Sequence, residues 1–264
     1  MPLKTSIADS CVILFGVLFI SIPVNAIMRA WGCSGRTQFE LVKKLQEAEI
    51  ITHDAVARVM ERVDRRYFCP RDPYNDAPQT IGYGQTISAP HMHAHALEEI
   101  YSVLKESQSP TLCMLDVGIG SGYLAACLGQ WVHPPKPIIG KNGTVYGIDV
   151  WPELLNQCQR NINALNVELL QYGTIQIGIG DGWEGLEGKR FDAIHVGAAA
   201  HSFPNKLMMQ LKVGGIMIVP VGPEGEVQTL YRIQKLQDAP QFSPQNFEIQ
   251  KLLGVRYVPL IHPK

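Results

Sequence analysis

Three apolar segments of this chain each end in an acidic residue beside glycine, a composition that suits a ligand site made from strand ends. The residues are Asp116, Gly118, Gly120 and Gly122 in LDVGIGSGYL, Asp149 in GTVYGID, and Asp181 with Gly182 in TIQIGIGDG. Glycine permits a tight turn and a close approach of the backbone to a ligand. If the segments are neighbouring parallel strands, their carboxyl ends meet at one crevice.

The spacing within these segments favours a nucleoside without phosphate groups. The turn reads G-x-G-x-G, not the G-x-G-x-x-G of a pyrophosphate cradle, and Asp116 stands just before it. Asp149 is placed to bind a ribose diol, and Asp181 to accept a hydrogen bond from an adenine amino group. Acidic residues at all these ends suit a cationic nucleoside, so we predict S-adenosylmethionine. The alternatives are a glycine turn that only packs tightly and acids that only cap helices.

The second half of the chain has to supply the sheet that brings these ends together. Apolar runs bounded by Gly or Asp predict strands at 111–118, 143–150, 174–182, 191–198 and 214–222, with two further strands at 228–236 and 254–262. Helical segments separate the first strands, at 123–131 and 152–165. This alternation predicts an α/β fold with a doubly wound, mostly parallel sheet.

The first half predicts a helical extension and an ordered loop. Residues 38–50 and 52–63 have helical periodicity, the second segment with Thr52 as its capping residue. Residues 66–84 have neither helical nor strand periodicity and predict a loop. A helix is then expected from Pro90 to about Leu104, with Ser88 in position to cap it.

Three histidines alternate at the start of that helix, as His91, His93 and His95. Because His91 and His95 are four residues apart, they would share a helical face, which raises the question of a metal site. Two histidines without a third ligand at suitable spacing leave zinc underliganded. We therefore expect no metal, and packing or hydrogen bonding to the loop for this pair.

Three further side chains are candidates for the crevice. His195, at the end of the strand at 191–198, either reaches the crevice or is a buried histidine that orders the next loop. Trp151 and Trp183 each follow an acidic strand end closely, and either pack near an adenine or fill the core.

Charge and cysteine content limit the function classes. The formal net charge is -1 and no run of Lys or Arg occurs, so the chain lacks the electrostatic footprint of a nucleic-acid or anionic-membrane binder. The six cysteines are scattered without a CxxC pair, which favours free thiols in a reducing compartment. We predict no nucleic-acid partner and a cytosolic location.

Residues 1–27 disturb this cytosolic picture. The run CVILFGVLFISI resembles the core of a signal peptide, with a plausible cleavage site after Ala26, which would direct the chain to the endoplasmic reticulum or to secretion. It is shorter than the roughly 20 apolar residues that a spanning helix needs. An equally weighted alternative is that the functional protein starts at Met28 and that the leader comes from an alternative or misassigned upstream start. Residues 28–264 are then expected to form a single domain, with a helical and substrate-loop part at 28–110 and a cofactor-binding sheet at 111–264.

Six segments, in this order, resemble the protein-L-isoaspartate (D-aspartate) O-methyltransferase family. They are YNDAPQTIGYGQTISAPHMHAHALE, LDVGIGSGYLAACL, GDGWEGL, FDAIHVGAAA, LKVGGIMIVPVGPEG and LLGVRYVPL. The resemblance implies a class I S-adenosylmethionine-dependent methyltransferase fold. It also implies methyl transfer to the free α-carboxylate of L-isoaspartyl or D-aspartyl residues in damaged proteins and peptides, after which the ester collapses to a succinimide that partly reverts to aspartate. We expect a monomer.

The resemblance also implies site residues. Ser88 is the implied active-site residue. The implied cofactor contacts are Gln85, Thr86, Ile87, Ser88 and His93 in the first motif, Val117, Gly118, Ile119, Gly120 and Ser121 around the methionine end, Asp149 and Val150 at the ribose and adenine edge, and Asp181 with Gly182 at the adenine.

The residue chemistry is compatible with this assignment. A carboxylate is already ionised at pH 7, so its attack on a sulfonium methyl group needs positioning and not a strong base. Ser88 and the start of the helix at Pro90 would hold the anion, because a helix N-terminus attracts negative charge. A catalytic base or a small-molecule lid would be expected in place of TISAPH in a small-molecule methyltransferase, and a non-catalytic S-adenosylmethionine-binding module would tolerate the loss of Ser88.

Two positions depart from the family pattern. Ile119 stands where a small polar residue is usual, which a loop facing solvent or the sheet edge would tolerate. After YVPL the family often has a polar residue and more chain, whereas here Ile261 follows and the sequence stops at Lys264. Closure over the cofactor by the C-terminal segment is therefore left open.

Overall fold

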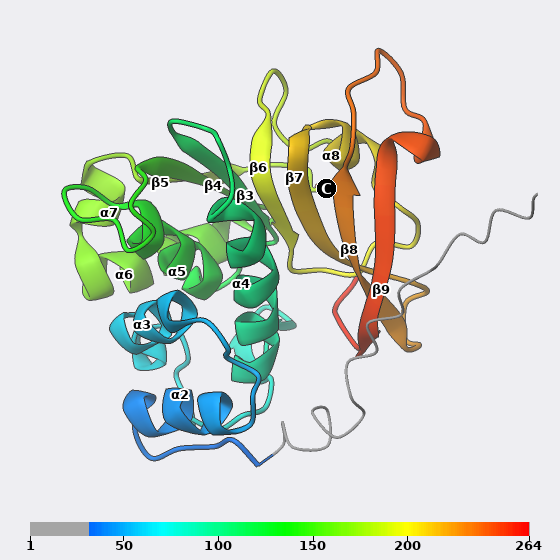
Figure 1. Cartoon of the computed structure of the whole chain (residues 1–264). Coiled ribbons are helices and arrows are strands. Elements are labelled where there is room, and N and C mark those ends of the chain that lie inside the picture. Colours follow the sequence, from blue (N-terminus) through cyan, green and yellow to red (C-terminus); the bar gives the residue numbers. More distant parts are fainter. Residues whose placement is uncertain (1–31, 264) are drawn as a thin grey trace, which may run out of the picture.

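A seven-stranded sheet organises the computed structural model, which describes residues 32–263 (Figure 1). The leader at 1–27 lies outside the described residues. The strand order is β5-β4-β3-β6-β7-β8-β9, where β3 to β7 pair in parallel and β8 and β9 are antiparallel. The strands are β3 (Leu112–Val117), β4 (Gly143–Asp149), β5 (Ile175–Ile179), β6 (Phe191–Val196), β7 (Leu211–Val221), β8 (Gln228–Lys235) and β9 (Phe247–Val255). The predicted doubly wound, mostly parallel α/β sheet is confirmed.

Alternate side chains of the central strands enter two separate hydrophobic cores, which explains their continuous apolar character. In β3, Leu112 and Met114 pack into the core on one face, and Leu115 and Val117 into the core on the other. Parallel strands covered on both faces have no polar side, so the sequence shows unbroken apolar runs.

Most helices pack on one face of the sheet (Figure 1), and the short α8 packs into the core on the other face. On one face α4 (Pro90–Leu104) contacts β6 and β7, and α5 (Tyr123–Val132) contacts β3 and β4. The N-terminal helices α2 (Gln38–Glu47) and α3 (Asp54–Arg62) pack on each other, and α3 reaches α4 and α5. The remaining helices are α6 (Pro152–Asn166), α7 (Glu168–Gln171), α8 (Asn205–Met209), and the 3-10 turns η1 (Arg65–Tyr67) and η2 (Pro244–Asn246). Within residues 32–263 no helix combines the length and the apolar character that crossing a membrane requires.

The segment predicted as a loop at 66–84 contains regular structure. It starts in η1 and ends in a β-hairpin of β1 (Gln79–Gly82) and β2 (Gln85–Ile87). The hairpin turn places Gly82, Tyr83 and Gly84 at positive φ, and each strand is only three or four residues long. Strands this short carry too few residues to show periodicity.

Both capping residues predicted for the N-terminal helices are wrong. The residue before α4 is Ala89, which makes no side-chain cap, so Ser88 is one residue too early. Pro90 does occupy the first turn of α4. The residue before α3 is His53, and the Thr52 hydroxyl contacts the Glu98 carboxylate instead.

The last predicted strand, 254–262, is also wrong. The edge strand β9 ends at Val255, and the residues after it run back toward the crevice with only an isolated bridge between Pro259 and Ala199. Because most β9 side chains are exposed or half-buried, this strand lacks the apolar run that marks the central strands.

Candidate active site

The glycine turn between β3 and α5 needs backbone conformations that favour glycine. Gly118, Gly120 and Gly122 have φ of 69°, 51° and 87°. The amides of Gly118 and Ile119 donate to the Ile148 carbonyl, and the amide of Gly120 donates to the Asp149 carboxylate at 3.0 Å. With these amides used inside the protein, the turn offers no cradle for a pyrophosphate, as its spacing predicts.

Asp149, at the carboxyl end of β4, keeps acceptor capacity for a ligand. Its Oδ2 accepts from Gly120 and its Oδ1 from the amide of Trp151 at 3.1 Å. A carboxylate has about four acceptor sites, so with three backbone donors around Asp149 one site stays open to a ribose hydroxyl. Burial raises the pKa of Asp149, and hydrogen bonds from the backbone of Gly120, Trp151 and Val150 oppose that effect.

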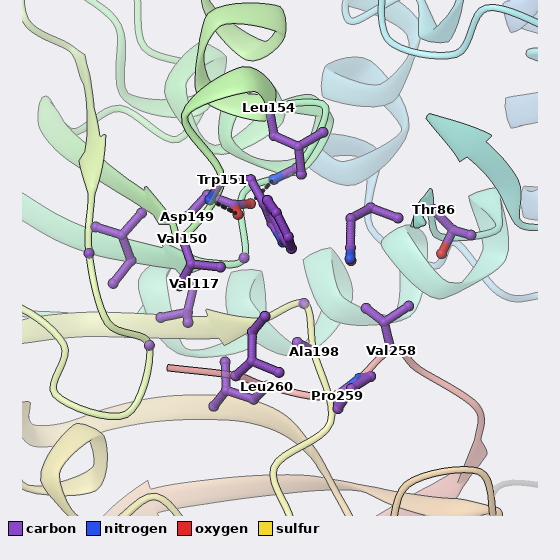
Figure 2. A pocket seen from close by; sticks show the side chains of 18 residues that line it. Thr86, Val117, Asp149, Val150, Trp151, Leu154, Ala198, Val258, Pro259 and Leu260 are labelled. Atoms are coloured by element: carbon purple, nitrogen blue, oxygen red, sulfur yellow. Dashed lines mark hydrogen bonds between the residues drawn. The ribbon is translucent and has the colours of Figure 1, made fainter. Parts of the chain in front are cut away.

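A cavity of about 550 Å³ lies over these strand ends, a size that accepts a nucleoside. Figure 2 shows Asp149 and Trp151 on one side of it, Pro259 and Leu260 on the opposite side, and Thr86 at one end. Its lining residues are Gln85, Thr86, Val117, Gly118, Gly120, Ile148, Asp149, Val150, Trp151, Leu154, Gly180, Gly182, Gly197, Ala198, Val258, Pro259, Leu260 and Ile261. An apolar wall with one carboxylate fits an adenosine: ring faces pack on the wall while the hydroxyls meet Asp149.

A second cavity of about 350 Å³ adjoins the first, because Thr86, Gly118, Gly120 and Gly197 line both. It is lined in addition by Ile87, Ser88, His93, Asp116, Ile119, Ser121, Tyr123, Leu124 and His195. All predicted site residues except Asp181 therefore line one of the two cavities, with Ser88 and His93 in the second. Their roles toward a ligand stay predictions.

A buried carboxylate and imidazole meet at the back of the second cavity. His195 Nδ1 lies 2.8 Å from Asp116 Oδ1, and both residues are under 10 % exposed. His195 is thus buried and also lines the cavity, so the two alternatives raised by the sequence both describe it.

The start of α4 has no free amide for a substrate anion. Asp76 accepts from the His91 amide at 2.9 Å and from His91 Nδ1 at 2.8 Å. The amides of Met92 and His93 donate to the Ala89 carbonyl. The expectation that this helix N-terminus holds the substrate carboxylate is wrong, because the protein's own Asp76 already occupies it.

No group of three or more potential ligands that could hold a metal ion occurs among the residues described, 32–263. His91 is engaged by Asp76, and burial lowers the pKa of His95. The geometry of the pair is that of packing and hydrogen bonding.

Comparison with known proteins identifies the relatives of this chain. A family model described as "Protein-L-isoaspartate(D-aspartate) O-methyltransferase (PCMT)" matches residues 36–264. The chain belongs to this family. It is 40 % identical over 208 residues to the protein-L-isoaspartate O-methyltransferase of Caenorhabditis elegans, covering 78 % of this chain and 88 % of the relative. Identity to the Triticum aestivum protein of the same name is 40 % over 224 residues, covering 83 % of this chain and 89 % of the relative.

A solved structure of a PCMT protein has the same fold. The structure of a putative protein-L-isoaspartate O-methyltransferase from Plasmodium falciparum, in complex with S-adenosyl-L-homocysteine, superposes with a TM-score of 0.73 at 32 % identity. The superposition covers 86 % of this chain and 99 % of the Plasmodium falciparum chain. The family resemblance and the class I methyltransferase fold expected from the sequence are confirmed.

In this PCMT-family chain the side chain of Ile119 is buried, contrary to our expectation of a loop facing solvent or the sheet edge. It is 5 % exposed and packs on Gly147 of β4, where any Cβ would overlap it. The glycine in β4 therefore makes room for the isoleucine that departs from the family pattern.

The C-terminal segment at 257–262, which we call the strap, reaches the crevice despite its short length. The Leu260 amide donates to the Ala199 carbonyl, and the Ala199 amide donates to the Val258 carbonyl. Val258 to Ile261 line the first cavity. Tyr257 pairs with the Ser88 side chain, a hydrogen bond that opposes the effect of burial in raising the Tyr257 pKa. The sequence predicted a strand here and left closure over the cofactor open, because the residues of the strap carry no acid or glycine signal.

Asp181 differs from the other predicted site residues. Its Oδ1 accepts from the Trp183 amide at 2.9 Å and its Oδ2 contacts His262 Nδ1 at 2.7 Å, and it lines neither cavity. Gly182 does line the first cavity, where it packs between Val117 and Leu260. Of the two tryptophans, Trp151 lines that cavity, whereas Trp183 donates to the Leu260 carbonyl and supports the strap.

Proposed function

We propose that this chain transfers a methyl group from S-adenosylmethionine to the free α-carboxylate of L-isoaspartyl, and of D-aspartyl, residues in damaged proteins and peptides. The observation that carries the proposal is the pair of adjoining cavities. One fits an adenosine around Asp149, and the adjoining one presents Ser88 and His93. The names of the relatives support the same activity.

The reaction asks this chain for positioning and not for a base. The cofactor supplies an electrophilic methyl group on sulfur; a carboxylate oxygen gains the methyl group as the carbon–sulfur bond breaks. The substrate carboxylate is ionised at neutral pH, so no proton has to be removed. Ser88 and His93 hold the anion in line, and the buried walls of the second cavity keep water away from it.

The product ester leaves the site before the repair is complete. Its methoxide is a better leaving group than the original carboxylate oxygen, so the following backbone amide nitrogen closes a succinimide without the enzyme. Hydrolysis of the succinimide gives part of the product as normal aspartate. The chain thus starts a repair and does not finish it.

The partner class follows from charge and site shape. The net charge of -1 supports a protein or peptide substrate over nucleic acid.

We propose a monomer of one domain at 28–264, because the helices at 38–62 share one hydrophobic core with strands of the sheet. The thiols of Cys69, Cys113, Cys127 and Cys158 are free, which supports a cytosolic location. A functional leader at 1–27 would direct the chain to the endoplasmic reticulum instead; comparing the gel mobility of the cellular protein with a form that starts at Met28 tests this.

The experiment that tests the activity uses two peptides that differ only in isoaspartate or aspartate at one position. The full chain with methyl-labelled S-adenosylmethionine should label the isoaspartyl peptide and leave the aspartyl peptide unlabelled. Equal labelling of both peptides, or labelling only of small carboxylic acids, would favour a methyltransferase of other specificity. Cofactor binding without any labelling would favour a non-catalytic module.

A further inference from the structure

Arg65 is a fully buried cation without a carboxylate partner. It lies in η1, is 0 % exposed, and has no carboxylate oxygen within 4.0 Å among the described residues. Burying a guanidinium in this way is costly, because the charge loses its water and gains no counter-ion. A protein keeps such a group where an anion arrives to pair with its charge or where its donors order a site.

The guanidinium contacts two residues that line the second cavity, Ser88 and His93. Its Nη2 donates to the Ser88 carbonyl at 2.6 Å, and its Nη1 lies 3.2 Å from His93 Nδ1. Its Nε has no hydrogen-bond partner, and its carbon stands 5.3 Å from the centre of the Tyr123 ring. One side chain thus fixes the backbone of the active-site serine and the ring of His93.

The contact with Arg65 decides which nitrogen of His93 carries the proton. A guanidinium has only donors, so Nδ1 of His93 must accept and the proton of the neutral ring must sit on Nε2. Burial, and next the charge of Arg65, lower the His93 pKa well below its usual value, which keeps the ring neutral. The Nε2–H is then a donor without a partner in the described part of the chain, on a residue that lines the cavity.

The first amides of α4 are already used, whereas the Nε2–H of His93 is a side-chain donor available to an anion in this cavity. We propose that Arg65 is a positioning residue that holds His93 in the Nε2–H tautomer and places its positive charge behind Ser88 and His93, so that they bind a carboxylate. The inference rests on the proposed function and names how its anion is held. The carboxylate is that of the substrate or that of the cofactor's methionine.

The tautomer can be measured on the folded wild-type protein. In chain carrying ¹⁵N-labelled histidine, long-range proton–nitrogen correlation spectra distinguish a ring protonated at Nε2 from one protonated at Nδ1. The His93 signals are assigned by their loss in His93→Gln. We expect the Nε2–H form at pH 7; a His93 that is protonated at Nδ1, or at both nitrogens, would overturn the proposal.

Substitution separates the charge from the geometry, with a matched control one residue away. Arg65→Met removes the charge and both donors, whereas Arg66→Met removes an exposed arginine that pairs with Asp64. We expect Arg65→Met to weaken carboxylate binding by about tenfold or more, Arg65→Lys to recover part of the loss, and Arg66→Met to match wild type. Circular dichroism and thermal unfolding verify that each variant is folded; if Arg65→Met does not fold, the wild-type tautomer decides.

The readouts identify the source of the carboxylate. A raised KM for the isoaspartyl peptide at unchanged kcat and unchanged Kd for S-adenosylhomocysteine assigns the substrate carboxylate. A raised Kd for S-adenosylhomocysteine with unchanged Kd for methylthioadenosine, which lacks the amino-acid group, assigns the methionine carboxylate. A folded Arg65→Met with wild-type KM and Kd values contradicts the inference. Failure of the wild-type chain to methylate the peptide would instead contradict the proposed function, while the tautomer would still test Arg65.

Discussion

The Nδ1 atom of His262 lies 2.7 Å from the Asp181 carboxylate, so the strap closes on the loop that follows β5. Between them, Leu260 packs against Gly182, and the Trp183 indole donates to the Leu260 carbonyl at 3.1 Å. These contacts hold Leu260, which lines the first cavity on the side opposite Asp149 (Figure 2). The strap residues 258–261 therefore complete the lining of the first cavity.

Gly182→Ala should displace this wall. A Cβ at Gly182 would lie 2.6 Å from both Val117 Cγ1 and Leu260 Cδ1, and the strap gives way more easily than the buried strand. We expect the Kd for S-adenosylhomocysteine, measured by calorimetry, to rise about tenfold or more, as a lost apolar contact of this size implies. Gly178→Ala is the control, because a Cβ there meets nothing within 4 Å. Equal affinity in the two variants would show that the strap does not shape the site.

Asp149→Ala should weaken cofactor binding far more than it weakens folding. The variant loses charge-assisted hydrogen bonds to the ribose hydroxyls, which predicts a rise in Kd of roughly 10–100-fold. Since burial raises the Asp149 pKa, wild-type affinity should also fall at acid pH, where the protonated carboxyl accepts less well. Glu153→Gln removes an exposed charge nearby and serves as the control. Calorimetry that returns wild-type affinity for Asp149→Ala would exclude the ribose role.

Acid should destabilise the fold through the histidines of α4. Burial lowers the pKa of both His93 and His95 in the folded chain. Below about pH 6.5 the unfolded chain takes up protons that the folded chain resists. For each of these histidines, the free energy of unfolding falls by about 1.4 kcal/mol per pH unit as the pH drops below the unfolded-state pKa. The fall stops when the pH reaches the pKa of that histidine in the folded chain.

Urea unfolding between pH 8 and pH 5.5 measures this loss. His95→Gln should make the free energy of unfolding less dependent on pH, because one of the resisting groups is gone. His201→Gln, at an exposed position, should keep the wild-type slope. The explanation fails if both variants have the wild-type pH dependence.

The sequence predicts the central sheet well and the site's edges poorly, for physical reasons. The strands that end at Val117 and Asp149 are buried on both faces, so their apolar runs are visible in the sequence. The hairpin before Ser88 and the edge strand β9 are short or mostly exposed and give no such signal. The glycine turn could be predicted from the sequence because its backbone has positive φ angles, which favour glycine.

Other site features depend on contacts between distant parts of the chain. Arg65 contacts Ser88 and His93, which are 23 and 28 residues away, and nothing in the sequence around Arg65 indicates burial. The strap was predicted as a strand, yet it bridges the sheet at only one point because it crosses the cavity instead of extending β9. The helix N-terminus could not be excluded as an anion site before Asp76 was seen to occupy it.

The central claim is that Ser88 acts on the carboxylate in the second cavity while Asp149 holds the cofactor in the first. Steady-state kinetics with an isoaspartyl peptide, combined with calorimetry for S-adenosylhomocysteine, tests it on Ser88→Ala, with Ser102→Ala on α4 as the control. We predict that kcat/KM falls roughly 10–100-fold, as the loss of a hydrogen bond to a charged group implies, while the Kd for S-adenosylhomocysteine stays within about twofold. Unchanged kcat/KM in Ser88→Ala, with the fold intact, would contradict the claim.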